Sequence, residues 1–239
     1  MYIIKHPPNG EDVFFLSALM PKRALIFING DLPNLDAARE IFRPDDYIIA
    51  ADGGTRHALV LGLLPTVVIG DLDSLDSANR RVLEEKNVRL IQHPIDKDET
   101  DLELALLYVC EQDYEQIVLV GALGGRLDQT LGNLSLLTDP ALEGLDVRMD
   151  DGVEEVFFAR KQVEVHGRIG DVVSLIPWGK DVTILHTEGL RWSLQNETLH
   201  AHQTRGISNE MLAENAHIEV KIGLLLIIHT RKERASHQV

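Results

Sequence analysis

Asp71 and Asp73 stand two residues apart directly after the apolar run 66–69 and Gly70. β-Branched residues without polar alternation are typical of a strand buried on both faces of a parallel sheet. In an extended backbone both carboxylates would point to one side, beyond the carboxyl end of the strand, where open α/β sheets bind ligands. Two carboxylates about 4 Å apart repel by roughly 4 kcal/mol at an effective dielectric near 20, so close approach needs a cation or a shared proton. Mg²⁺ suits such an all-oxygen pair; a solvated Asx turn is the alternative for this motif taken alone.

Three more acidic or glycine-rich turns follow predicted strands, at 51–54, 96–101 and 124–129. Loops after parallel strands gather at one edge of a doubly wound sheet, so we expect these turns to share one cavity with the 70–74 turn. Their candidate ligands are Asp52, Gly53 and Gly54, then Lys97, Asp98, Thr100 and Asp101, then Gly124, Gly125, Arg126, Asp128 and Gln129. Glycine lets backbone amides approach phosphate oxygens, while Lys97 and Arg126 offset phosphate charge. Carboxylates and anion-binding amides in one place predict a metal–polyphosphate complex.

Each of these three motifs also fits a simpler structure when taken alone. The 51–54 segment fits a tight turn, 96–101 a solvated capping segment, and 124–129 a loop with a salt bridge. The chain has neither GxxxxGK[ST] nor GxGxxG, so no P-loop or dinucleotide fingerprint supports phosphate binding. A nucleotide would have to be held in another way.

The segment 24–137 alternates apolar strands with helical patterns. We expect strands at 24–28, 47–51, 66–69, 88–91 and 117–120, and helices within 35–42, 55–63, 77–86 and 126–137. Thr100 followed by Glu103 matches a capping box, which predicts a helix beginning at Thr100 beside Asp98 and Asp101. This alternation predicts a doubly wound, Rossmann-like α/β domain with a parallel sheet.

The pattern changes near residue 151, where short strands separated by turn residues begin. We expect strands within 156–160, 161–167, 171–177, 182–187 and 217–230, and no helix. Ile218, Val220 and Ile222 alternate with charged residues, as in a half-buried antiparallel strand. The sequence therefore predicts an N-terminal extension at 1–23, an α/β domain at 24–150, and an antiparallel β-sandwich or barrel domain at 151–239.

Composition excludes several functional classes. The 239 residues carry a formal charge of -15 and are 44% hydrophobic, which is typical of a globular protein and argues against a nucleic-acid-binding surface. Cys110 is the only cysteine, so neither an intrachain disulfide nor a cysteine-based zinc site can form. The longest apolar run, 223–228, is far shorter than the roughly 20 residues of a membrane-spanning helix. We expect a cytoplasmic protein without a membrane partner.

The motifs ADGG, GDLDS, KDETD and GGRLDQ occur in this order, before a carboxyl half that contains Trp192 and the 206–209 segment GISN. As a set, over about residues 24–230, they resemble the thiamine pyrophosphokinase (thiamine diphosphokinase) family. The resemblance implies transfer of the pyrophosphoryl group of ATP to thiamine, which yields AMP and thiamine diphosphate. Family members often have a histidine where this chain has Gln129.

The resemblance also implies roles for particular residues. It implies Mg²⁺ held by Asp71, Asp73 and an aspartate of KDETD, for which we favour Asp98 and then Asp101. Asp52 and Asp128 match positions of the nucleotide and metal cavity, and Arg126 would contact phosphates. The family is homodimeric, with the β domain of one subunit completing the thiamine site of the other. Trp192 would stack on the cationic thiamine rings, and Ser208 and Asn209 would hydrogen-bond the aminopyrimidine.

Two other functions fit the same residues. A different Mg²⁺-dependent nucleotidyl- or phosphotransferase would use the acidic edge on another alcohol, and a non-catalytic nucleotide- or thiamine-binding module would bind without turnover. The density of aspartates argues against the second, because an anion-binding site prefers basic residues. His200 and His202, with His217 nearby, also allow a zinc site, but exposed strand histidines are the favoured interpretation.

Overall fold

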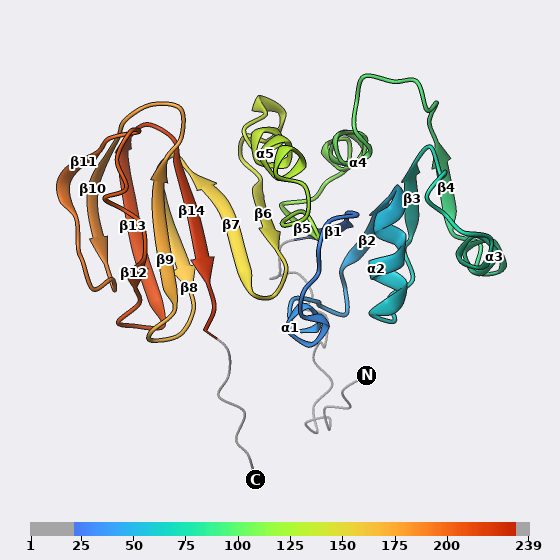
Figure 1. Cartoon of the computed structure of the whole chain (residues 1–239), viewed down its shortest axis with the longest axis horizontal. Helices are drawn as coiled ribbons and strands as arrows, with labels where there is room; N and C mark the ends of the chain where they lie inside the picture. Colours follow the sequence, from blue (N-terminus) through green and yellow to red (C-terminus); the bar gives the residue numbers. More distant parts are fainter. Residues whose placement is uncertain (1–21, 233–239) are drawn as a thin grey trace, which may run out of the picture.

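A computed structural model describes residues 22–232 of the chain (Figure 1). The predicted N-terminal extension lies outside these residues except for Lys22 and Arg23, and Arg23 is already the first residue of β1. The first sheet contains β1 (Arg23–Phe27), β2 (Tyr47–Ala51), β3 (Val67–Gly70), β4 (Arg89–Gln92), β5 (Gln116–Val120), β6 (Asp146–Asp150), β7 (Glu154–Ala159), β9 (Val172–Pro177), β12 (Asn209–Glu210) and β14 (Leu225–Thr230). The second contains β8 (Gln162–His166), β10 (Val182–Glu188), β11 (Gln195–Leu199) and β13 (Asn215–Ile222).

The helices all lie in the first two thirds of the described chain. They are α1 (Leu35–Arg39), α2 (Thr55–Val60), α3 (Ser77–Glu85), α4 (Asp101–Cys110) and α5 (Leu127–Leu136), with the short 3-10 helices η1 (Asp52–Gly54) and η2 (Pro140–Leu142). Thr100 caps α4 by accepting a hydrogen bond from the Glu103 amide, as the capping pattern predicts. No helix within residues 22–232 is long and apolar enough to cross a membrane.

The first sheet joins a parallel half to an antiparallel half. Within residues 22–232 its order is β12-β9-β14-β7-β6-β5-β1-β2-β3-β4, with parallel pairing from β6 through β4 and antiparallel pairing from β6 through β12. The switch occurs at the β6–β7 hairpin, where Asp151 accepts hydrogen bonds from the Val153 and Glu154 amides. The carboxyl ends of β1, β2, β3 and β5 therefore meet at one edge (Figure 1).

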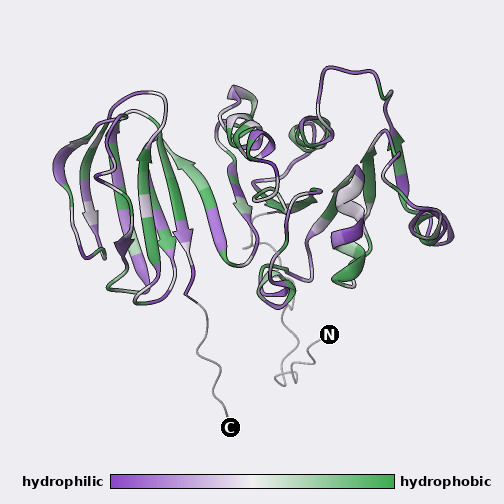
Figure 2. Cartoon of the chain, viewed as in Figure 1, coloured by the Kyte–Doolittle hydropathy of each residue, from purple (hydrophilic) through white to green (hydrophobic). Residues whose placement is uncertain are grey.

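Helices cover both faces of the parallel half. One face packs against α4 and α5 through residues such as Leu106 and Leu134, and the other packs against α1, α2 and α3 through Ala38, Ala58 and Leu83. The central strands β1, β2, β3 and β5 are mostly apolar, as the sequence pattern predicts, whereas β4 and β6 also carry polar residues (Figure 2). This packing fixes the strand ends from which the polar turns project.

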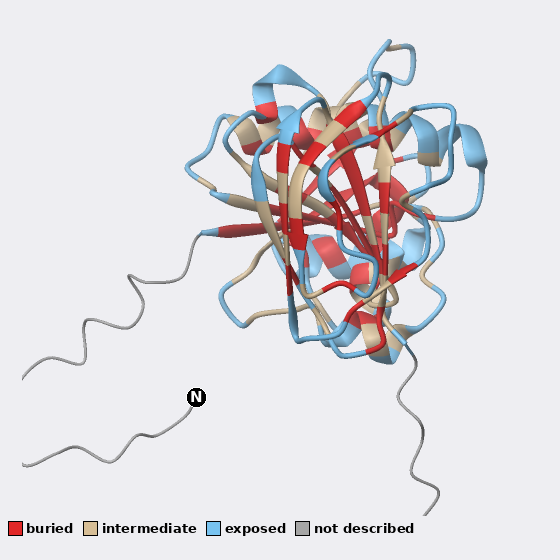
Figure 3. Ribbon diagram, turned by 90° about the vertical axis from the view of Figure 1, so that its left-hand side faces the viewer, coloured by how far each residue is buried: buried red, intermediate tan, exposed pale blue. Residues whose placement is uncertain are grey.

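The antiparallel half forms a sandwich with the second sheet. Residues of β7, β9 and β14, including Phe157, Leu175 and Ile227, pack against Ile184, Ile218 and their neighbours of the second sheet. In the view of Figure 3 the buried strands run through the middle of the molecule, and exposed loops surround them. Ile218 and Val220 are buried while Ile222 is exposed, so the predicted alternation holds for the first two of the three residues.

The predicted fold class, a doubly wound α/β sheet with an antiparallel β-sandwich, is confirmed. The expected strands and helices are present within one or two residues at most ends, and no helix follows residue 154 in the described part. β6, β11 and β12 were not predicted. The division at residue 151 stays a prediction, and the first sheet runs through this point without interruption.

A buried network of charged side chains lies where the two halves of the sheet meet. Glu155 on β7 accepts a hydrogen bond from Arg148 on β6 at 2.8 Å and lies 3.4 Å from the His229 imidazole on β14. Arg148 also pairs with Asp146 at 2.7 Å, and Arg231 pairs with Asp150 at 2.7 Å. Burial acts to raise the pKa of Glu155, but the His229 hydrogen bond and the nearby guanidinium groups outweigh it and lower this pKa to about 2.

We expect Glu155→Gln to lower the free energy of unfolding at pH 7 by about 3 kcal/mol, the low end for breaking a buried ion pair, because Arg148 and Arg231 each keep a second carboxylate. The pKa of Glu155 falls from its ordinary 4.5 to about 2 on folding, so its stabilisation is complete above pH 4.5 and is lost as the pH falls toward 2. Urea unfolding at pH 7 and pH 3 measures this. The exposed control Glu143→Gln should be neutral, and an equal effect of Glu155→Gln at both pH values would contradict the assignment.

Candidate active site

The turn after β3 places Asp71 and Asp73 beside each other. Leu72 between them has φ +65° and is buried, so the two aspartates flank an inward-pointing side chain. The Asp73 amide donates to Asp71 Oδ1 at 3.0 Å, which is the Asx turn that the motif alone allows. The turn is therefore both a local Asx turn and a way of bringing two carboxylates together.

Asp52 joins this pair from the turn after β2. Ala51 pairs with Ile69 in the parallel ladder, so the two turns begin at the same level of the sheet. A Cβ on Gly70, whose φ is +149°, would lie 2.8 Å from the Asp52 Cβ, which shows how closely the turns approach. Carboxylate oxygens of Asp52, Asp71 and Asp73 lie within 4.8 Å of one another. We call these three residues the carboxylate cluster.

The carboxylate cluster is electrostatically unfavourable by itself. Burial raises the pKa of the Asp52 carboxyl, and the charges of Asp101, Asp71 and Asp73 raise it further against a lowering hydrogen bond from Ser74. Among residues 22–232 no donor reaches the buried Asp52 Oδ1. Asp52 also has φ +39°, a backbone conformation that aspartate tolerates better than most residues. Three convergent carboxylates, one of which has a buried oxygen without a donor, fit a hard divalent cation such as Mg²⁺.

Lys97 lies against the cluster from the side of the α4 amino end. Its Nζ is 3.0 Å from Asp101 Oδ1 and 3.9 Å from Asp71 Oδ2, and its side chain is only 12% exposed. Burial acts to lower the pKa of the Lys97 ammonium, but the neighbouring carboxylates outweigh it and the pKa is raised. In this structure Lys97 balances aspartate charge, whereas the sequence predicted that it offsets phosphate charge.

These turns line one cavity of about 520 Å³ at the carboxyl ends of the parallel strands. Nine of the residues predicted for the metal and nucleotide line it: Asp52, Gly53, Asp71, Asp73, Thr100, Asp101, Gly124, Asp128 and Gln129. Five predicted residues do not line it: Gly54, Lys97, Asp98, Gly125 and Arg126. The structure thus brings all four turns to one cavity but not every residue of each.

A second, smaller hollow of about 200 Å³ brings together the residues predicted for thiamine. Trp192, Ser208 and Asn209 line it, and the Trp192 side chain is exposed. The Asn209 amide is already engaged, because its Oδ1 accepts from the Trp192 amide at 3.0 Å and its Nδ2 donates to the Trp192 carbonyl at 2.8 Å. The Arg191 guanidinium lies 5.3 Å from the centre of the Trp192 ring, so this ring already meets one cation.

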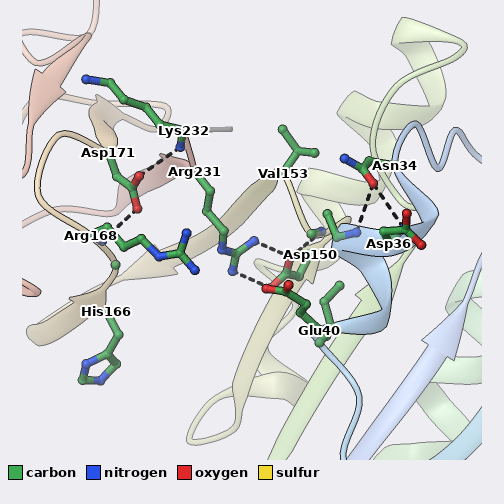
Figure 4. A pocket seen from close by; sticks show the side chains of 14 residues that line it. Asn34, Asp36, Glu40, Asp150, Val153, His166, Arg168, Asp171, Arg231 and Lys232 are labelled. Atoms are coloured by element: carbon green, nitrogen blue, oxygen red, sulfur yellow. Dashed lines mark hydrogen bonds and ion pairs between the residues drawn. The ribbon is translucent and has the colours of Figure 1, made fainter. Parts of the chain in front are cut away.

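A larger cavity, of about 830 Å³, lies elsewhere, between α1 and the ends of β6, β8 and β14 (Figure 4). Its central groups are occupied by one another: Arg231 binds Asp150, and Asp171 accepts hydrogen bonds from the Arg168 and Lys232 amides. It contains none of the residues predicted for function. The smaller cavity at the sheet edge is the better candidate active site, because the carboxylate cluster lies there.

Two family models match this chain. Residues 38–149 match thiamin pyrophosphokinase, catalytic domain, and residues 160–225 match thiamin pyrophosphokinase, vitamin B1 binding domain. Thiamine pyrophosphokinase 1 of Arabidopsis thaliana is 30% identical over 186 residues, which cover 73% of this chain and 68% of that protein. The chain belongs to the thiamine pyrophosphokinase family.

Other relatives agree with this assignment. Thiamine pyrophosphokinase of Bacillus subtilis is 29% identical over 184 residues, 76% of this chain and 86% of that protein. Its crystal structure superposes with a TM-score of 0.79 at 25% identity and covers 89% of this chain and all of that chain. Yeast thiamin pyrophosphokinase, at 18% identity and a TM-score of 0.70, shares the fold.

Asp98 lies outside the carboxylate cluster. It is exposed in the loop before α4 and does not line the cavity, whereas Asp101, which we ranked second, does. Asp98 precedes the helix and Asp101 begins it, so only Asp101 is fixed by α4. The geometry thus places Asp52 as the third carboxylate of the cluster, and the metal role of Asp98 stays a prediction.

Several predicted phosphate contacts are used otherwise. Arg126 pairs with Asp128 at the exposed start of α5. The Gly125 amide donates to Asp31 Oδ2 at 2.7 Å, so it is not free for a phosphate. A Cβ on Gly54 would lie 2.0 Å from the Phe27 carbonyl oxygen, so this position needs glycine for packing against β1.

Sequence reasoning missed two lining asparagines. Asn29 follows β1, as the other turns follow their strands, so the strand-end rule could have found it. Asn133 lies on α5 and donates to the Ala122 carbonyl at 2.9 Å; no sequence motif marked it.

The histidines of the second sheet do not form a metal site in the described residues. His200 and His202 lie in the turn after β11, not on a strand as expected, and His200 binds Asp181 at 2.7 Å. His217 pairs with Glu164 on the neighbouring strand. Among residues 22–232 the carboxylate cluster is the only group of three or more Asp, Glu, His or Cys side chains whose ligand atoms lie within 4.8 Å of one another.

We expect Asp52→Asn to raise the free energy of unfolding of the metal-free protein at pH 7, because it removes a buried charge whose pKa is raised by folding. Asparagine also tolerates the left-handed backbone. The same change should remove most of the increase in melting temperature that Mg²⁺ produces. Thermal unfolding with and without Mg²⁺ measures both effects. The exposed control Asp113→Asn should change neither, and an Mg²⁺ response retained in Asp52→Asn would rule out this ligand.

Proposed function

We propose that this chain transfers the pyrophosphoryl group of ATP to the hydroxyethyl oxygen of thiamine, giving AMP and thiamine diphosphate. The observation that carries the proposal is the carboxylate cluster inside a cavity bordered by glycine turns, in a chain of this family. The thiamine oxygen bonds to the β-phosphorus of ATP while the bond from that phosphorus to the bridging oxygen of AMP breaks. The hydroxyl proton passes to an acceptor in the cavity or to water.

Asp52, Asp71 and Asp73 would hold Mg²⁺, and Asp101 lies beside them in the same cavity. When bound, the cation neutralises charge on the phosphates and on the leaving oxygen. The residues of the chain act mainly by position. Gly53, Ala122 and Gly124 line the space for the phosphates, and the raised pKa of Lys97 keeps a positive charge beside the cluster.

The hollow around Trp192 would bind thiamine. The exposed ring offers a flat face to the cationic thiamine rings, and Asn209 holds the backbone that carries the ring. The cavity and the hollow share no lining residue. A homodimer, in which the hollow of one subunit faces the cavity of the other, would bring the substrates together. We propose this arrangement, in the cytoplasm.

We expect Asp71→Asn to lower the rate of AMP formation at least about 100-fold with little change in melting temperature, because it removes one of three charges that bind the cation. Asp98→Asn should lower the rate of AMP formation by less than about tenfold, since Asp98 lies outside the cavity. A coupled AMP assay, with thiamine omitted as the blank, measures both. Near-normal turnover of folded Asp71→Asn would refute the metal assignment, and ADP or free pyrophosphate as products would favour the other transferase.

We expect Trp192→Ala to raise the KM for thiamine by about tenfold, within the range for loss of a cation–π contact, and to leave the KM for ATP unchanged. Steady-state kinetics with each substrate varied in turn measures this split. Ile222→Ala, an exposed apolar residue of β13, is the matched control and should change neither KM. An equal rise in both KM values would show that Trp192 acts through the fold.

A further inference from the structure

Asp31 is an exposed residue of the loop between β1 and α1, and it binds the glycine turn that follows β5. Its Oδ2 accepts a hydrogen bond from the Gly125 amide at 2.7 Å. Its own amide donates to the Leu123 carbonyl at 3.2 Å. Both bonds join segments that are more than 90 residues apart in the sequence.

The same loop is fixed at its start. The Gly30 amide donates to the Gly121 carbonyl at 2.8 Å, and His57 Nε2 lies 2.8 Å from the Gly30 carbonyl. A carbonyl only accepts, so Nε2 carries the proton, and burial lowers the pKa of His57, which favours the neutral imidazole. We call these four hydrogen bonds, two from Asp31 and two at Gly30, the Asp31 clasp.

The glycine turn needs such an external contact. Gly124 and Gly125 have φ +73° and +65° and are exposed, so they have no side chain of their own to fix the turn. On the α5 side the Thr130 hydroxyl donates to the Gly124 carbonyl at 3.1 Å, and Asn133 Nδ2 donates to the Ala122 carbonyl at 2.9 Å. Asp31 supplies the contact from the β1 side, and its partner is the Gly125 amide. A hydrogen bond from an amide to a carboxylate is about twice as strong as one between neutral groups. A Cβ on Gly124 would lie 2.9 Å from the Asp31 Cβ, so the contact is close as well as directional.

The 122–125 turn forms part of the cavity wall and leads into α5. Gly124 lines the cavity directly, and the first residues of α5, which include Asp128 and Gln129, follow the turn. The Gly124 backbone can contact a phosphate in one fixed geometry only if the turn is restrained to one conformation. The Gly125 amide is used by Asp31, so Asp31 acts on the wall and not on the ligand.

We propose that Asp31 is a positioning residue for the nucleotide, which holds the 122–125 turn against β1 so that the cavity is formed before ATP binds. This inference rests on the proposed function only in naming ATP as the ligand. The carboxylate acts as a hydrogen-bond acceptor and not as a charge that attracts the substrate, because ATP is itself an anion.

The test compares Asp31→Ala and Asp31→Asn with the matched control Asp139→Ala, whose carboxylate also accepts an amide, that of Ala141 at 2.8 Å, at the far end of α5. We expect Asp31→Ala to weaken ATP binding about tenfold, measured by calorimetry with Mg²⁺ present, and to leave the KM for thiamine unchanged. Asp31→Asn keeps an acceptor oxygen, so its dissociation constant for ATP should stay within about threefold of the wild-type value. Amide hydrogen exchange at Gly125 should become faster in Asp31→Ala alone.

Each outcome decides the proposal. Unchanged ATP binding in Asp31→Ala would show that Asp31 does not position the turn, and tighter binding would show that its charge repels the nucleotide. An equal loss in Asp31→Asn would show that charge and not the acceptor matters. An equal loss in Asp139→Ala, or a large fall in melting temperature with both KM values raised, would show a general structural role. If the wild-type protein binds ATP but forms no AMP with thiamine, the proposed function fails. ATP calorimetry and amide hydrogen exchange at Gly125 would then still test the role of Asp31.

Discussion

Mutual repulsion of three carboxylates is the interaction around which the rest of this structure is arranged. Carboxylate oxygens of Asp52, Asp71 and Asp73 lie within 4.8 Å of one another, and the pKa of Asp52 is raised by burial first and then by the charges of the neighbouring aspartates. A fold that holds like charges together must fix them from outside, since each would move away if its backbone were free. Here the backbone comes from buried parallel strands, which cannot shift without losing their ladders. Under the proposed function, a divalent cation held by the cluster would relieve this repulsion.

The register of the sheet sets this geometry. Ala51 lies opposite Ile69, so the turns after β2 and β3 start side by side, and Gly70 lets Asp52 pass close to its backbone. Burial on both faces, by α4 and α5 on one side and α1 to α3 on the other, keeps the strands in that register. Lys97 adds one positive charge at the edge of the cluster. Rigid strands therefore supply position, and the exposed turns supply chemistry.

The sequence predicted those residues of the cavity that directly follow buried strands. Asp52, Asp71, Asp73 and Gly124 were found because each follows a buried strand, and all four line the cavity. Asp98 was ranked before Asp101 under the family resemblance. The capping box placed Asp101 at the start of a helix, and Asp101 lines the cavity, while the metal role of Asp98 stays a prediction. The engagement of the Gly125 amide by Asp31 joins segments far apart in the chain, so no local pattern marks it. The joining of both predicted domains in one sheet was missed for the same reason: strand pairing depends on the β6–β7 hairpin, which the strand pattern does not specify.

That shared sheet makes the two halves of the chain dependent on each other, although separate family models describe them. Arg148 faces Phe157 and Asp150 faces Glu155 across β6 and β7, and the ion pairs of Arg148 and Arg231 lie at the same junction. If the polypeptide were cut after Gly152, each fragment would expose a bare row of backbone amides and carbonyls along a long strand, together with unpaired buried charges. Such an edge invites strand addition by other chains. Neither fragment would be a sound unit for separate expression, and hinge motion between them would have to break the same ladder.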